Sequence, residues 1–180
     1  MRKIVLASLC ALIALPLLAA VEGPDSKSIL AKHWAVSKQF TIEVANAMPA
    51  GDYDFKPNPE EMSFGQVMAH IAQANNAAFA RVSGLKAPDI PEVMQKARKD
   101  LSTHLDKDLV IKFLTASFEF CEQTLKEITP EQMAKMSGPE GRQLSGHEVL
   151  WSYFTHTAHH RGQAEVYLRV KNIKPPAYRF

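Results

Sequence analysis

The amino-acid sequence predicts an all-α protein, a four-helix bundle, and three observations lead to this expectation. First, apolar residues recur mostly at spacings of three and four, as in a helix, and little of the chain alternates as a strand does. Second, four long segments carry this period, at about 26–48, 63–83, 105–128 and 145–170. Third, polar stretches with proline or glycine separate these segments, which is typical of a bundle around one core.

Residues 1–20 are expected to be a secretory signal peptide. Two basic residues precede an apolar block over 4–18, and Ala19 and Ala20 offer a small-residue cleavage site. The block is shorter than the about 20 residues of a membrane-spanning helix, which disfavours the alternative of an uncleaved anchor. We therefore expect export to the periplasm or the extracellular space, and a single mature domain over 21–180 with no stable membrane insertion.

The charge balance excludes two classes of partner. The chain has 21 Lys and Arg against 19 Asp and Glu, and loss of the two basic residues of the signal peptide leaves 19 against 19. A neutral domain lacks the basic face of nucleic-acid-binding proteins and the charge that attracts proteins to anionic lipid. Cys121 would be the only cysteine after cleavage, so packing rather than a disulfide must stabilise the monomer.

The first helix is expected from about Ser26 to Met48. Pro49 and Gly51 end it, and two prolines keep the following loop, 52–62, out of helical conformation. One stripe along the helix is apolar or small and is predicted to be buried: Leu30, Trp34, Ser37, Phe40, Val44 and Met48.

The second and fourth helices begin with the same signal. Ser63 is followed three residues later by Gln66, and Ser145 by Glu148, which is the spacing of a capping box. Gly84 supplies a C-terminal stop for the second helix, and a Pro-Pro pair closes the last segment. The inner stripe of the second helix is expected to comprise Val67, His70, Ile71, Ala74, Ala78 and Val82.

The third helix is expected over about 105–128. The preceding segment, 86–103, contains two prolines and has room for one short helix over 92–99. A further cap at Thr129 opens one or two helical turns, and a loop follows at 138–141. The buried face of the third helix is predicted to be Val110, Phe113, Leu114, Ser117, Cys121, Leu125 and Ile128.

Two of the seven histidines share one face of the last helix. His156 and His160 are four residues apart, so their imidazoles lie one above the other. Tyr153 and Gln163 extend the same face, which we expect to point inward. Two imidazoles at this spacing can chelate one metal ion, at bonding distances of about 2.0–2.1 Å for zinc. Such a pair alone is a weak signal, because a core histidine is often only hydrogen-bonded.

A third histidine on another helix strengthens the prediction. His70 falls on the inner stripe of the second helix, between Val67 and Ala74. Three inward-facing imidazoles would be costly without partners, and one shared divalent ion would satisfy them all. Three neutral nitrogen ligands also leave positions open for water or a small-molecule substrate. The sequence therefore predicts a metal site formed by His70, His156 and His160.

The remaining candidates are interpreted as structural. His33, His104 and His147 are expected at the surface or at helix ends, and His159 points about 100° away from the ligand that follows it. Cys121 is expected in the core, with a role as fourth ligand as the alternative. The chain has no HExxH zinc motif, no glycine-rich phosphate loop and no serine nucleophile elbow, so those enzyme classes are excluded.

Three segments resemble the DinB/YfiT-like superfamily. The run SFGQVMAHI at 63–71 is similar to its second-helix motif, and HTAHHRGQ at 156–163 is similar to its last-helix motif. The segment 53–59 resembles the loop before the second helix, so the resemblance covers nearly the whole mature domain. It implies a four-helix bundle with unusual connections, often a homodimer, that binds metal at the three histidines named above.

The resemblance also implies a range of metals and activities. Zinc, nickel, iron and manganese are all implied occupants of such a site. Members with known activity are thiol-dependent transferases and isomerases, in which the metal would activate the thiolate of a low-molecular-weight thiol. The predicted signal peptide departs from this pattern, because such thiols are kept reduced in the cytoplasm.

Three hypotheses about function stay open at this point. The first is a metal-dependent hydrolase, isomerase or thiol transferase, in which Tyr153, Gln163 or Asn75 orients a water or substrate and no general base is evident. The second is a non-catalytic metal-binding module, and the third is an interaction bundle with coincidental histidines. Metal content separates the third from the others, and turnover separates the first two. Because ligand histidines must be neutral, affinity is expected to fall below about pH 6.5.

Overall fold

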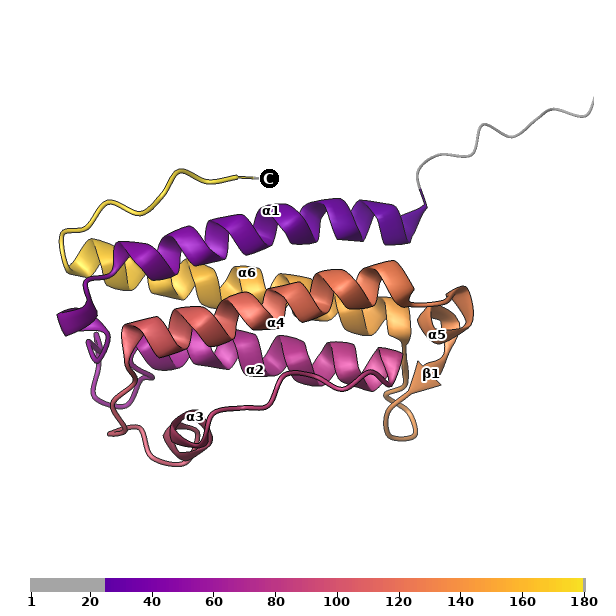
Figure 1. The fold of residues 1–180 in the computed structure, drawn as a ribbon, viewed down its shortest axis with the longest axis horizontal. Coiled ribbons are helices and arrows are strands. Elements are labelled where there is room, and N and C mark those ends of the chain that lie inside the picture. Colours follow the sequence, from indigo (N-terminus) through magenta and orange to yellow (C-terminus); the bar gives the residue numbers. More distant parts are fainter. Residues whose placement is uncertain (1–24, 180) are drawn as a thin grey trace, which may run out of the picture.

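The computed structural model describes residues 25–179, so the signal peptide predicted over 1–20 lies outside the described residues. Four long helices form a bundle (Figure 1): α1 (Ser26–Ala47), α2 (Phe64–Ser83), α4 (Lys107–Glu127) and α6 (Gly146–Val170). The expected all-α four-helix bundle is confirmed. The shorter elements are a 3-10 turn η1 (Ala50–Asp52), α3 (Glu92–Ala97), α5 (Pro130–Ala134), β1 (Met136–Ser137) and β2 (Leu144–Ser145).

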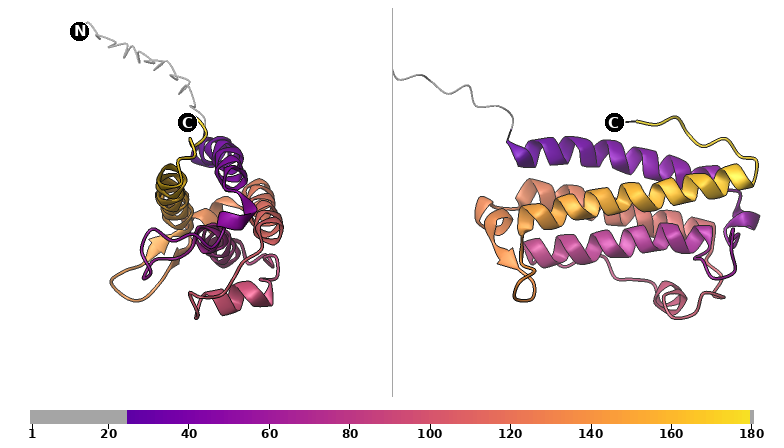
Figure 2. Two further views of the ribbon diagram at one scale, coloured as in Figure 1. Left: turned by 90° about the vertical axis from the view of Figure 1, so that its left-hand side faces the viewer. Right: turned by 180° about the vertical axis from the view of Figure 1, so that it is seen from behind.

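The long helices are arranged in a ring. Helix α2 packs against α4 and α6, and α1 packs against the same two helices. The end-on view in Figure 2 accordingly shows α1 and α2 at opposite corners of the bundle. Helices α2 and α6 are therefore neighbours although more than 60 residues separate them in the sequence.

One long connection gives the bundle its topology. After α2 the chain runs back along the outside of the bundle over residues 84–106, carrying α3, before α4 begins (Figure 1). Helices α2 and α4 consequently point in the same direction. At the opposite end α5 is followed by the antiparallel pair β1–β2, in which Met136 faces Ser145. Such two-residue strands have no periodicity for a sequence to display, and they were not expected.

The helix starts follow the predicted capping chemistry. In α2 the Ser63 hydroxyl accepts from the Gln66 amide at 3.3 Å, and the Gln66 side chain accepts from the Ser63 amide at 2.9 Å. The same reciprocal box opens α6 at Ser145 and α5 at Thr129. Helix α4 begins two residues later than expected, because the Asp106 carboxylate accepts from the Leu109 amide and fixes the start there.

The buried faces agree with the predicted stripes on α1 and α4. All predicted members are buried, including Trp34 and Cys121 at 0% exposure. Helix α2 is more enclosed than a single stripe requires, because the long connection covers a further side of it, whereas Ala74 and Val82 are only partly buried. The ring of Trp34 on α1 contacts one aromatic ring from each of the other long helices, the last of them partly buried. We call these four residues the aromatic cluster: Trp34, Phe79, Phe118 and Phe154.

An arginine fixes the rotation of α6 about its own axis. Arg161 is 7% exposed, and its Nη1 donates to the hydroxyls of Ser37 at 3.1 Å and Thr41 at 3.3 Å on α1. Its guanidinium also lies 4.4 Å from the centre of the Phe40 ring. Because Arg161 faces α1, the side chain one residue earlier, at His160, is turned about 100° around the helix, toward α2.

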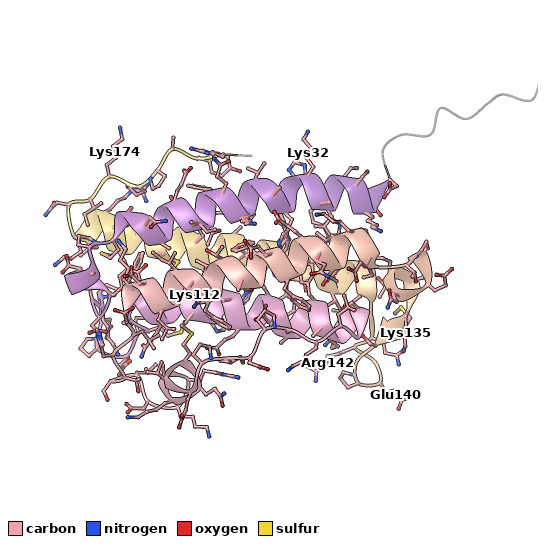
Figure 3. The ribbon with its side chains drawn as sticks, in the orientation of Figure 1. Lys32, Lys112, Lys135, Glu140, Arg142 and Lys174 are labelled. Carbon is pink, nitrogen blue, oxygen red and sulfur yellow. The ribbon has the colours of Figure 1, made fainter. Side chains whose placement is uncertain are left out.

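The outside of the bundle is charged. Figure 3 shows side chains projecting from the helices and from the β1–β2 turn, and the labelled residues are exposed: Lys32, Lys112, Lys135, Glu140, Arg142 and Lys174. None of the helices within residues 25–179 combines the length and the hydropathy that a membrane crossing needs.

Candidate metal centre

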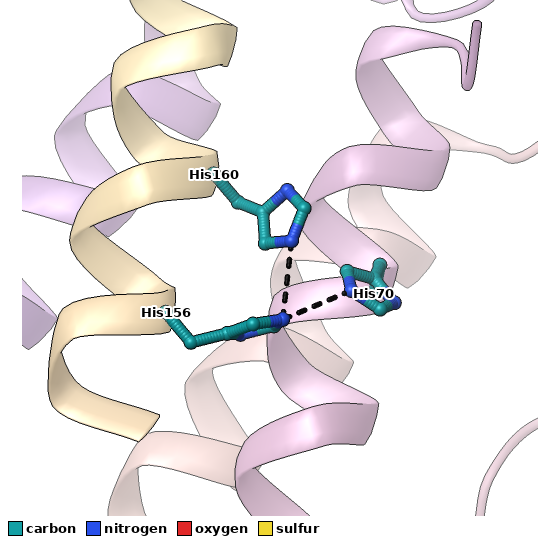
Figure 4. A group of neighbouring side chains, drawn as sticks. All are labelled: His70, His156 and His160. Carbon is teal, nitrogen blue, oxygen red and sulfur yellow. Dashed lines mark hydrogen bonds between the residues drawn. The ribbon is translucent and has the colours of Figure 1, made fainter. Parts of the chain in front are cut away.

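The three predicted ligands meet between α2 and α6. His70 lies at the end of the second turn of α2, and His156 and His160 lie on successive turns of α6 (Figure 4). The Nε2 atom of His156 is 3.2 Å from Nε2 of His70 and 3.1 Å from Nε2 of His160. One nitrogen from each ring lies within 4.8 Å of the other two, so the three side chains could hold one metal ion. We call this group the histidine cluster.

The spacing of the nitrogens suits a metal ion. At zinc–nitrogen distances of about 2.0–2.1 Å, two ligands of a tetrahedral site are about 3.3 Å apart. The two shortest nitrogen separations in the cluster are close to this value. The cluster holds three imidazoles and no carboxylate or thiolate, which suits ions such as zinc, nickel, iron or manganese better than the oxygen-seeking Mg²⁺ and Ca²⁺.

A glutamine fixes the tautomer of one histidine. Oε1 of Gln163 lies 2.7 Å from Nδ1 of His160. An amide oxygen only accepts, so Nδ1 carries the hydrogen and Nε2 presents its lone pair to the cluster. Gln163 was one of three residues that the sequence offered for orienting a water or substrate. In the structure it bonds to a ligand ring and sets the orientation of that ring.

The environment keeps the cluster neutral. Burial is the largest of the causes that together lower the pKa of His70 to about 4, and the neighbouring His160, His156 and Arg98 supply the rest. Burial also lowers the pKa of His156 and of His160, and the hydrogen bond from His160 to Gln163 opposes this shift in part. At neutral pH the three rings are therefore in the uncharged form that binds metal.

The cluster is reachable from outside. All three histidines are only partly buried, so one side of the group faces the surface of the α2–α6 seam. The ring of Tyr153 flanks His156, with ring centres 5.5 Å apart. Asn75 is fully buried and accepts a hydrogen bond from Thr157 at 3.0 Å, which makes it part of the core.

The remaining histidines and the cysteine lie outside the cluster. His147 accepts from the Trp151 indole at 2.8 Å, and His104 pairs with Asp54 at the surface. His159 is exposed and contacts Gln163 at 3.3 Å, and it does not belong to the group of three that could hold one ion. Cys121 is buried in α4, and burial raises the pKa of its thiol, so it is a core residue and no ligand.

Two side chains near the cluster were not found by sequence reasoning. Gln73 and Arg98 line a cavity that also contacts His70. Arg98 lies just after the short helix α3, whose position against α2 is set by tertiary packing. The irregular segment 84–106 shows no periodic pattern, so no sequence signal pointed to its contacts.

Fold and site together define an all-α bundle with a candidate three-histidine metal centre between its second and last long helices. The chain belongs to the DinB superfamily, whose sequence profile matches residues 34–164. The recognition made from the two histidine motifs is thereby confirmed.

Individual relatives agree with this assignment. The chain is 25% identical to the uncharacterized protein YjoA of Bacillus subtilis strain 168 over 143 residues, which cover 78% of this chain and 87% of that protein. Its fold is similar to the crystal structure of that DinB-like protein, with a TM-score of 0.64, 21% identity, and 83% and 96% of the two chains covered. A DinB-like protein from Bacillus cereus gives a TM-score of 0.68 at 17% identity, with 83% and 95% covered.

Proposed function

We propose that this protein binds one divalent metal ion through His70, His156 and His160 and uses it in catalysis on a small-molecule substrate. The observation that carries the proposal is the convergence of one nitrogen from each of three imidazoles, on two helices, within 4.8 Å. A core without a metal has no use for three clustered lone pairs, because each must then find a hydrogen-bond donor.

The chain's own residues prepare the site for this role. Gln163 holds the His160 ring, and burial keeps His70 neutral, so neither ligand has to lose a proton near pH 7. A divalent ion held there would supply Lewis acidity to a substrate heteroatom or water. Three protein ligands and a partly exposed position favour a site that takes a substrate over a closed structural one.

The reaction class stays within the three predicted alternatives, which are hydrolysis, isomerisation and transfer to a thiol. Tyr153 is the polar side chain that flanks the cluster and is suited to orient a bound substrate. The proposal includes export, for which the pattern of the first 20 residues is the support. Cell fractionation tests the localisation, and sizing of the mature protein tests the proposed homodimer.

The experiment compares metal content with turnover. The mature protein is purified without added metal, analysed for bound elements, and assayed against ester, lactone, isomerisable and thiol-acceptor substrates, beside the His160→Ala variant. We expect about one ion per chain in the wild type, loss of that ion in the variant, and turnover that disappears with it.

The result also separates the alternatives. An ion without turnover would identify the non-catalytic metal-binding module, for which chelation lowers the melting temperature and changes no activity. Equal and negligible metal content in wild type and variant would leave the histidines coincidental and end the proposal.

A further inference from the structure

A cavity of about 210 Å³ adjoins the histidine cluster. It lies between α2 and the connection that carries α3, and His70 belongs to both its wall and the cluster. The contributing side chains on α2 recur every three or four residues and so share one face of that helix. The full lining is Met62, Gln66, Ala69, His70, Gln73, Met94, Ala97, Arg98, Leu101 and Leu105.

Most of this lining is apolar. Two methionines, two leucines and two alanines contribute to it, and Met94 and Leu105 are completely buried. Methionine side chains adapt their shape to a ligand at low cost. A concave, mainly apolar space with a few polar groups is the usual form of a small-molecule site. The body of a molecule bound here is therefore hydrocarbon-like.

A buried amide oxygen in the cavity wall lacks a hydrogen-bond donor. Gln73 is 7% exposed, and its Nε2 donates to the Met94 carbonyl at 3.4 Å. Its Oε1 is buried and has no hydrogen-bond donor within residues 25–179. An unpaired buried acceptor costs free energy, which a ligand with a donor group would recover.

An arginine at the edge of the cavity is also without a partner. The Arg98 side chain forms no ion pair or hydrogen bond with any residue in the range 25–179. Arg98 and His70 line the same cavity, which places the guanidinium on the side of the cluster where His70 lies. A free guanidinium recognises carboxylates through paired N–H donors. The cavity thus offers a cation at its rim and an acceptor within.

We propose that this cavity binds the body of the substrate, an apolar small molecule that carries a carboxylate for Arg98 and a hydrogen-bond donor for Gln73. The reacting end of the molecule reaches the histidine cluster past His70. This inference rests on the proposed function, because it assigns the substrate class of the same metal site.

Alkyl hydroxamates test the proposal, because the head group chelates a metal and the chain length can be varied. Calorimetry measures their binding to the zinc-loaded mature protein for chains of two, four and six carbons. Burial of each methylene is expected to tighten binding about fourfold. A six-carbon hydroxamate with a terminal carboxylate is expected to bind at least tenfold tighter than its methyl ester, and Arg98→Gln is expected to remove that difference.

Two variants test whether the alkyl chain of the hydroxamate occupies the cavity. Ala97→Phe fills the cavity from the short helix α3 and should flatten the chain-length series without changing zinc content or the affinity of the two-carbon probe. Ala77→Phe places the same ring at an exposed position of α2 and should leave the series unchanged. If Ala97→Phe does not fold, the affinities of the six-carbon carboxylate and its methyl ester for the wild type and for Arg98→Gln decide whether the substrate body binds in this cavity.

The experiments distinguish failure of the proposed function from failure of the cavity assignment. If the mature protein bound none of zinc, nickel, iron and manganese, the proposed function would be overturned and this inference with it. Bound zinc with equal affinities for all chain lengths, or a chain-length series that survives in a folded Ala97→Phe, would overturn the cavity assignment alone. Equal affinities for acid and ester would overturn the role of Arg98.

Discussion

The aromatic cluster and the histidine cluster share α2 and α6 but are built for different purposes. In the aromatic cluster, rings from all four long helices meet, with Trp34, Phe79 and Phe118 at 0% exposure. The histidine cluster draws on α2 and α6 alone, remains partly exposed, and turns polar nitrogens toward one another. The first arrangement gains free energy from burial, whereas the second is costly unless something binds there.

The comparison predicts that the two clusters respond independently to mutation. On α2, Phe79 lies nine residues beyond His70, which is about 13 Å along the helix. Substitutions at such separations add independently. A change at one cluster should therefore leave the other unaffected.

The largest effect is expected in the aromatic cluster. Phe118→Ala removes a fully buried ring and should lower the free energy of unfolding by about 3–5 kcal/mol, because a cavity is left among packed neighbours. Denaturant titration measures this loss, with Lys112→Ala on the exposed side of α4 as the control. Metal stoichiometry of the folded variant should stay at the wild-type value, and its loss would show that the clusters are coupled.

In the histidine cluster, the corresponding substitution is His156→Ala. Loss of one of three ligands should weaken metal affinity more than about 100-fold, since even losing a residue that only orients a ligand costs 10–100-fold. The apoprotein should keep its stability, because His156 brings a buried Nδ1 that has no partner in the described part of the chain. His104→Ala removes an exposed histidine that pairs with Asp54 away from the cluster, and it is the control for competition titrations. Equal losses in both variants would count against the cluster.

Lowering the pH should weaken metal binding less than it would for three histidines with ordinary pKa values. Three histidines with ordinary pKa values near 6.5 would lose about a thousandfold in affinity between pH 7.5 and 5.5. Because the pKa of His70 is lowered to about 4, that residue stays neutral over this range and the loss is at most about 100-fold. The sequence-based expectation of a decline below pH 6.5 is thus shifted to lower pH. Calorimetry across the range measures it, and a full thousandfold loss would contradict the lowered pKa.

The same shift predicts the stability of the metal-free protein. Between about pH 6.5 and 4 the unfolded chain binds more protons than the folded one, so stability falls as the pH falls through this window. The aromatic cluster contains no titratable group and contributes nothing to this dependence. In His70→Gln the free energy of unfolding should therefore depend less on pH. In Phe118→Ala it should be lower by a similar amount at every pH.

A smaller effect is expected at Gln163. Gln163→Ala frees the His160 ring and should weaken metal affinity about 10–100-fold, because the ligand loses the acceptor that holds its tautomer. Gln163→Glu keeps an acceptor and should restore most of the affinity. Competition titration compares the three proteins, and an unchanged affinity in Gln163→Ala would limit the residue to a packing role.

The parts of each cluster that could be predicted are those with a local pattern in the sequence. Trp34 on α1 lies on a predicted stripe with helical period, and the caps at Ser63 and Ser145 are local signals, so these were found. Phe118 was not predicted to be buried, because the buried face of α4 is wider than the single predicted stripe. The three histidines were found because an i, i+4 pair and an inward position on a second helix are visible in the chain. Asp106 as the cap of α4 was missed, because Leu105 before it continues the apolar pattern.

The cavity could not be predicted, because it depends on how an irregular segment folds back. Gln73 and Arg98 come together only when residues 84–106 pack along α2, and no periodicity in that segment indicates its register. Arg161 shows the same limit, since an arginine on a helix is usually exposed and its burial depends on hydroxyls from α1.

The most direct measurement is a crystal structure of the metal-loaded protein with data collected at the absorption edge of the bound element. A single anomalous peak about 2.0–2.1 Å from Nε2 of His70, His156 and His160 is expected. A map without a peak between α2 and α6, or with a peak that contacts the α6 pair while His70 points elsewhere, would contradict the central claim that imidazoles from both helices share one ion.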